Sequence, residues 1–116
     1  MSALNLDRFL DVCGPDEAEV AEAADLYLAF LAEQLRLLTD ALSNHQLSEI
    51  ELIAHRCAGS CATYGMDPLV EPMAAMERDA REGRLPDPSL ATAARAACAV
   101  IESALRPLAA RRVPAH

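Results

Sequence analysis

Apolar residues recur at every third or fourth position through most of the chain, which is the spacing of one buried face on an α-helix. The longest run lies between residues 16 and 42, where charged side chains fall on the opposite side. We therefore predict a long helix here, with an apolar face wide enough to contact two neighbours. Its periodic positions are Val20, Ala24, Tyr27, Leu31, Leu35, Leu38 and Leu42.

Glycine and proline mark where the other helices begin and end. A short amphipathic stretch ends at residues 13–16, and Asp16 is suited to cap the long helix that follows. A third helix is expected over residues 47–63. It should stop near Gly65, because glycine suits the left-handed conformation at a helix C-terminus.

The fourth and fifth helices are each expected to begin at an Asp-Pro pair. Asp67 is predicted as the N-cap of the fourth helix, in which Glu77 and Arg81 have the spacing of an exposed ion pair. In the fifth, Pro107 is expected to end or kink the helix, because proline lacks a backbone N–H. Residues 109–116 are then predicted to form a frayed tail.

These segments predict an all-α fold: an up-down antiparallel four-helix bundle with a short N-terminal capping helix. Short connections between helices of similar length favour antiparallel neighbours. The 116 residues fit a single domain spanning 1–116. The composition agrees, because 53% of residues are hydrophobic and only 3% aromatic, so the core must be built from good helix formers such as leucine, alanine and methionine.

The net charge and the absence of targeting motifs argue against nucleic-acid and membrane partners. The chain has 18 acidic residues against 10 basic ones, a net charge of -8, so phosphate backbones would be repelled and no nucleic-acid partner is expected. A polybasic patch, a secretion signal and a membrane-length apolar run are all missing, so we expect a cytoplasmic monomer with no membrane partner. Reduced thiols are expected at Cys13, Cys57, Cys61 and Cys98.

The third predicted helix carries one unusual face. Its apolar residues share a core stripe, and His55 lies about 140° from the centre of that stripe, so the imidazole should point outward. Gly59, one turn further on, costs roughly 1 kcal/mol of helix propensity relative to alanine. We therefore predict a shallow, open surface that another molecule approaches. The neighbours of His55 on it are Glu51, Leu52, Ala58, Gly59 and Ala62.

The segment Ala54-His55-Arg56-Cys57-Ala58-Gly59-Ser60, continued by Glu77, Arg81 and Gly83, resembles the signature of histidine-containing phosphotransfer domains. The motif region spans residues 50–84. The resemblance implies a helical bundle in which His55 accepts a phosphoryl group and Gly59 keeps the surface open. Members of that family often carry lysine three residues after the histidine, where this chain has Ala58.

The resemblance also implies partners and cofactors. The phosphoryl group would pass between aspartates of receiver domains in a two-component phosphorelay, and the partners would be receivers of response regulators, a hybrid sensor histidine kinase, or both. Magnesium would come from the receiver, so the chain itself needs no cofactor. It has no glycine-rich phosphate loop, so we expect no autokinase activity.

Other interpretations of the same residues are open. His55 could be an ordinary surface histidine, as we expect His45 and His116 to be. His55, Cys57 and Cys61 could be proposed as metal ligands, but the thiols share the core stripe while the imidazole points elsewhere, so no metal site is expected. The alternative function is a non-catalytic helical adaptor that binds a protein partner through the same Ala/Gly-rich face.

Overall fold

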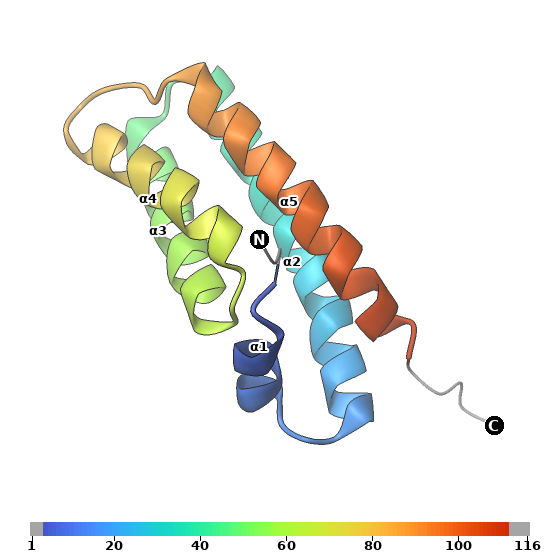
Figure 1. The fold of residues 1–116 in the computed structure, drawn as a ribbon. Helices are drawn as coiled ribbons and strands as arrows, with labels where there is room; N and C mark the ends of the chain where they lie inside the picture. Colours follow the sequence, from blue (N-terminus) through green and yellow to red (C-terminus); the bar gives the residue numbers. More distant parts are fainter. Residues whose placement is uncertain (1–3, 112–116) are drawn as a thin grey trace.

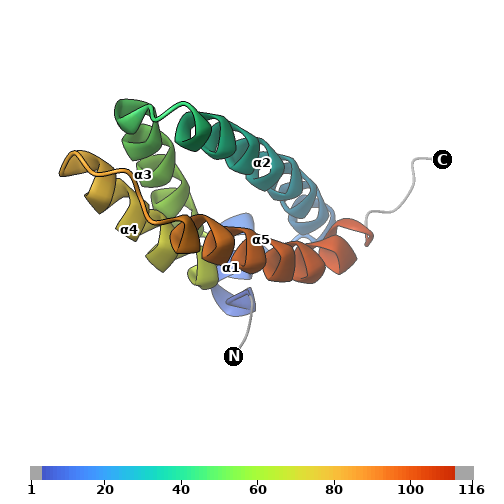
Figure 2. The same ribbon diagram turned by 90° about the horizontal axis from the view of Figure 1, so that it is seen from above.

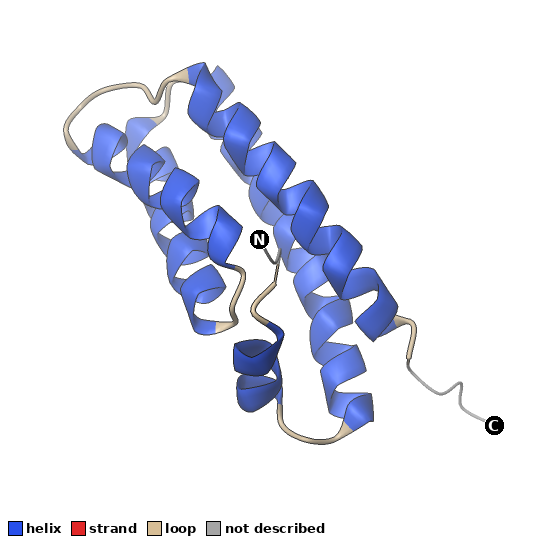
Figure 3. Ribbon diagram, in the orientation of Figure 1, coloured by secondary structure: helices blue, strands red, loops and turns tan. Residues whose placement is uncertain are grey.

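The computed structural model describes residues 4–111, and all regular structure in that range is helical. The elements in chain order are α1 (Leu6–Cys13), α2 (Glu17–Ser43), α3 (Leu47–Thr63), α4 (Asp67–Arg81) and α5 (Pro88–Ala109) (Figures 1 and 3). The prediction of an all-α fold is confirmed for this part of the chain. None of its helices has the length and apolar content needed to span a lipid bilayer.

The four longer helices form a bundle in which each packs against two others. α3 packs most extensively against α4, α2 against α5, and the two pairs meet through α2–α3 and α4–α5 contacts (Figure 2). α2 and α5 are longer than α3 and α4 and extend past them, as Figure 1 shows. Because α3 has α2 on one side and α4 on the other, only part of its circumference reaches solvent.

α1 and the residue before it are hydrogen-bonded to the connection between α3 and α4. The backbone N–H of Asn5 donates to the carbonyl of Gly65 at 2.7 Å, and the Arg8 guanidinium donates to the Ala62 carbonyl and to the Asp67 carboxylate. Gly65 has φ +79°, and a Cβ there would lie 2.6 Å from the Asn5 carbonyl oxygen. Glycine at this position therefore serves both the turn and the close approach of α1.

Asp16 caps α2 as predicted, and Asp87 caps α5 at the expected Asp-Pro pair. The Asp16 carboxylate accepts a hydrogen bond from the Ala18 N–H at 2.9 Å, and the Asp87 carboxylate accepts one from the Ser89 N–H at 2.8 Å. Each satisfies a donor that the first turn of a helix leaves unpaired, which is worth about 1 kcal/mol.

Asp67 differs from its prediction as an N-cap. Met66 occupies the cap position and Asp67 is the first residue of α4. Its carboxylate instead bonds Arg8 at 2.8 Å. A local capping rule could not anticipate this, because Arg8 lies far away in the sequence and reaches Asp67 only when α1 packs.

α5 does not end at Pro107, which was one of the two outcomes expected there. α5 continues through Pro107 to Ala109, and the buried side chain of Leu108 anchors this last turn to the core. Proline withholds only one hydrogen bond here, at the end of the helix, where the cost of losing it is smallest. The predicted frayed tail thus begins too early, since Ala109 is helical and the N–H of Ala110 bonds the Arg106 carbonyl. Residues 112–116, with His116, lie outside the described range.

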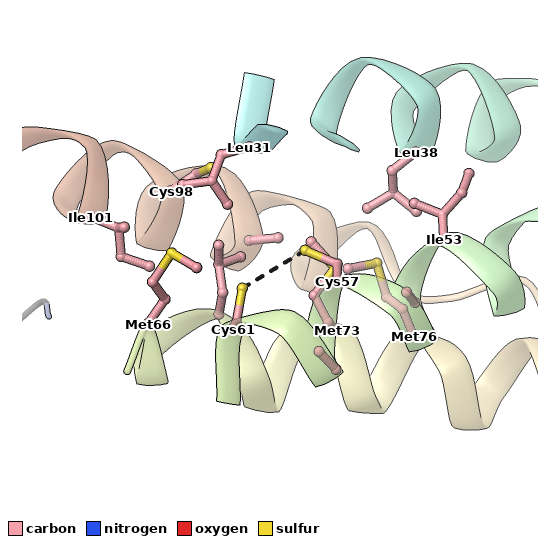
Figure 4. Close-up of a cluster of buried hydrophobic side chains, with 14 of the residues drawn as sticks. Leu31, Leu38, Ile53, Cys57, Cys61, Met66, Met73, Met76, Cys98 and Ile101 are labelled. Carbon is pink, nitrogen blue, oxygen red and sulfur yellow. Dashed lines mark hydrogen bonds between the residues drawn. The ribbon is translucent and has the colours of Figure 1, made fainter. Parts of the chain in front are cut away.

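The core between the four longer helices consists of aliphatic and sulfur-containing side chains. Figure 4 shows them converging from the four helices and, for Met66, from the turn before α4: Leu31, Leu38, Ile53, Cys57, Cys61, Met66, Met73, Met76, Cys98 and Ile101. Methionine fits such a core because its flexible thioether fills irregular gaps between leucine-sized neighbours. All four cysteines are free thiols, and only Cys13 is partly accessible. Burial raises the pKa of the Cys98 thiol to about 12.

Candidate functional site

His55 lies in the middle of α3 and points away from the core. Its side chain is 71% exposed, whereas the neighbouring residues Ala54 and Cys57 are fully buried. This contrast follows from helical geometry, since the residues that pack against α2 and α4 fix the rotation of α3 about its axis. The histidine is therefore presented on a rigid element rather than on a mobile loop.

Gly59 lies one turn after His55 and has no packing role. A Cβ built there would meet no atom within 4 Å, so the space above it is open. Its conformation is ordinary α-helix, so strain does not explain the glycine either. What the glycine provides is a surface without a side chain beside the imidazole. Leu52 and Ala62 on the same face are also exposed.

Ala58 departs from the predicted open face. It is only 9% exposed and belongs to the hydrophobic core. The prediction treated α3 as having one buried stripe, but α3 packs against both α2 and α4, so its buried arc is wider. Of the predicted neighbours of His55, Leu52, Gly59 and Ala62 are exposed and Glu51 is partly exposed.

Glu77 of α4 makes the contact that sequence analysis missed. Its Oε2 lies 2.9 Å from Nδ1 of His55, and the Glu77 side chain is only 14% exposed. The same Oε2 accepts a hydrogen bond from Arg81, whose Nε also donates to Glu51 at 3.3 Å. The spacing of Glu77 and Arg81 predicted only an exposed ion pair between them. Its place in the motif, together with the short connection between α3 and α4, was the only signal of this contact.

This geometry defines which ring nitrogen of His55 is available. A carboxylate only accepts hydrogen bonds, so its partner Nδ1 carries the proton, an assignment that rests on the hydrogen-bond network. The lone pair of the neutral imidazole is then on Nε2, which has no hydrogen-bond partner among residues 4–111. α3 thus presents a ring nitrogen with a free lone pair on an exposed side chain, and the hydrogen bond to Glu77 fixes the tautomer.

His55 also lines an open depression of about 500 Å³. It lies along α3 and α4 and is lined by Ser48, Glu49, Glu51, Leu52, His55, Glu77 and Arg81. The depression is shallow and carries charges of both signs. Such a surface suits a reacting group delivered by another protein better than a small substrate, which a site usually encloses.

The two thiols nearest His55 in sequence do not join it. Cys57 and Cys61 lie 3.9 Å apart, sulfur to sulfur, in the core (Figure 4), while the imidazole is on the surface. Within residues 4–111, no three side chains of histidine, cysteine, aspartate or glutamate converge as a metal site would require. Of these three side chains, the two thiols are buried and the imidazole is exposed, so they do not share one face of α3.

Ser60, the serine of the motif, faces α2 rather than His55. Its hydroxyl is 2.9 Å from the hydroxyl of Tyr27. The Tyr27 ring packs against that of Tyr64, with centroids 4.5 Å apart. Burial raises the pKa of Tyr27 to about 12. Ser60 therefore joins α3 to α2 and helps to fix the rotation of α3 that presents His55.

The sequence matches one known family over most of its length. The family model for the Hpt domain matches residues 22–104, a range that includes all of α3 and α4 and most of α2 and α5. No curated protein matches the chain, and no solved structure does. Because the match covers most of the chain, the protein belongs to the Hpt domain family, whose members carry out histidine phosphotransfer in two-component signalling.

Proposed function

We propose that this protein relays a phosphoryl group between aspartates of receiver domains, and that Nε2 of His55 carries it as phosphohistidine. The observation that supports this most strongly is the pairing of Nδ1 with Glu77 at 2.9 Å beneath an imidazole that is 71% exposed. A histidine held this way has one nitrogen fixed and the other free. A largely buried carboxylate that is hydrogen-bonded to an exposed imidazole favours a functional role for that histidine.

The transfer step follows from the chemistry of the two groups. The Nε2 lone pair attacks the phosphorus of an aspartyl phosphate in line with the bond to the leaving oxygen. The P–N bond forms as the P–O bond breaks, and its electrons leave with the aspartate carboxylate. The imidazole becomes positively charged, and the Glu77 carboxylate faces that charge through Nδ1. Return of the phosphoryl group to another aspartate is the same step reversed.

The partner supplies what the chain lacks. Charge on the transferring phosphoryl group is offset by a magnesium ion that the receiver domain carries, so no metal is assigned to this protein. Gly59 leaves room for the receiver to bring its aspartyl phosphate into line with Nε2. Receivers of response regulators and a hybrid sensor histidine kinase are the proposed partners, and a cytoplasmic, monomeric protein is proposed.

The test is transfer from a phosphorylated receiver to wild type, His55→Gln and His45→Asn. His45 is a matched control because it is exposed and lies outside the motif, and asparagine tolerates its positive φ of 52°. Wild type and His45→Asn should acquire an acid-labile, alkali-stable phosphate, whereas His55→Gln should acquire none. Labelling of His55→Gln contradicts the assignment. A wild-type protein that binds receivers without being labelled indicates the adaptor function instead.

A further inference from the structure

The charged side chains behind His55 form a continuous chain across α3 and α4. Glu77 Oε2 accepts from both His55 and Arg81, and Arg81 also donates to Glu51. The Arg81 guanidinium therefore interacts with two carboxylates, those of Glu77 and Glu51. The other ionised side chain lining this depression is Glu49 on α3. The inference below rests on the proposed function and concerns what this arrangement does once His55 is phosphorylated.

The proton on Nδ1 decides whether phosphohistidine can give up its phosphoryl group. When Nδ1 keeps its proton, cleavage of the P–N bond returns the electron pair to Nε2 and leaves neutral imidazole, which is a good leaving group. When that proton is lost, the same cleavage must expel an imidazolate anion, a far stronger base. With Nδ1 protonated throughout, attack and departure need no proton transfer in either direction.

Glu77 is placed to retain that proton. Its carboxylate is 14% exposed and directly hydrogen-bonded to Nδ1, so its negative charge favours the protonated form of the phosphorylated ring. Arg81 opposes this effect, because it bonds the same carboxylate oxygen. Glu51 in turn draws part of the Arg81 charge away from Glu77.

We propose that Glu77 and Arg81 act as opposing positioning residues that set the pH range over which phosphorylated His55 releases its phosphoryl group. Glu77 extends this range to higher pH and Arg81 limits it. The protein then holds its phosphoryl group in a form ready for transfer rather than in a stable store, and the pair sets how long the phosphorylated state lasts.

The two residues should therefore move the pH profile in opposite directions. Glu77→Gln keeps an oxygen that can accept from Nδ1 but removes the charge, so the pH at which the release rate falls by half should drop by about half a unit. Arg81→Gln leaves Glu77 uncompensated, and the midpoint should rise by a similar amount. Arg81→Lys keeps the charge and should stay near wild type. If Glu77 and Arg81 only stabilised the fold, the two substitutions would not shift the pH midpoint in opposite directions.

The experiment loads each full-length protein with phosphoramidate, a small chemical donor of phosphoryl groups to histidine, and purifies the phosphorylated form. Loss of phosphate is then followed across the neutral pH range, both in buffer alone and with one magnesium-loaded receiver common to all variants. Arg78→Gln and Glu71→Gln are matched controls, because both residues are exposed on α4 and outside the depression. Thermal melts establish that each variant is folded.

Midpoints in the order Arg81→Gln, wild type, Glu77→Gln, from high pH to low, support the proposal. It is overturned if both variants move in the same direction, which indicates that Arg81 acts on the phosphoryl group itself, or if neither differs from the controls. Failure of the proposed function gives a different result. In that case wild type acquires no phosphate from any receiver and passes none to one, whatever the pH midpoints are.

Discussion

The substitution Gly59→Gln tests whether the glycine is needed for docking of a receiver or for packing of the helix. A Cβ at this position meets no atom within 4 Å, so the longer side chain has room and the fold should survive. Glycine in a helix interior is about 0.8–1 kcal/mol less favourable than alanine, and glutamine stands close to alanine. The substitution should therefore stabilise the protein by about half a kcal/mol and raise its melting temperature by about 2 °C.

Phosphotransfer should respond in the opposite direction. The new side chain lies one turn from Nε2 of His55, where a receiver must align its aspartyl phosphate. A misplacement of about 1 Å can cost a hundredfold in rate, so we expect a loss of about that size. Rapid-quench transfer from a phosphorylated receiver measures the rate, and thermal unfolding measures the stability. Gly59→Ala is the matched control, since it gains at least as much helix propensity but adds only a methyl group.

Two results would refute this reasoning. If Gly59→Gln unfolds the protein or lowers its melting temperature, the glycine is needed for packing and the outward rotation of α3 is wrong. If the folded variant transfers phosphate at the wild-type rate, receivers do not approach across Gly59. Gly59→Ala should lie close to wild type in transfer rate while gaining stability, which separates an effect of side-chain length from an effect of helix propensity.

Three further predictions concern the support of α3 and the limits of its chemistry. Ser60→Ala removes the hydrogen bond to Tyr27 and should cost about 1 kcal/mol in the free energy of unfolding, measured by urea denaturation, with transfer largely retained. Burial raises the pKa of Tyr27 from 10.0 to about 12, so the stability that comes from its protonated form is complete below pH 10 and lost as the pH rises towards 12; denaturation across this range should show the loss in wild type and less of it in Tyr27→Phe. Purified protein with ATP and magnesium should acquire no phosphate, and stoichiometric labelling would show a kinase activity that we do not expect.

The helical pattern predicted those parts of the site that depend on a single helix. The outward direction of His55 follows from the spacing of its buried neighbours, and the caps at Asp16 and Asp87 follow from local sequence. Contacts between helices were beyond this reasoning. Glu77 had the spacing of an ion pair, which it forms with Arg81, but its contact with His55 depends on how α3 packs on α4.

Two errors have the same physical origin. Ala58 was predicted on the open face because one stripe was taken as the whole buried surface of α3, although α4 covers a second side. Asp67 was predicted as a cap because its local sequence favours one, although α1 brings Arg8 within 2.8 Å of its carboxylate. In both cases a tertiary contact between distant segments outweighed a local preference.

The most direct test of the central claim is to identify the residue that carries the phosphate after transfer from a phosphorylated receiver. The labelled protein is digested under alkaline conditions, which preserve phosphohistidine, and its peptides are sequenced by mass spectrometry. We predict a single phosphate on the α3 peptide at His55 and none on the same peptide from His55→Gln. Phosphate on another histidine, or an acid-stable phosphate on a serine or threonine, would contradict the account.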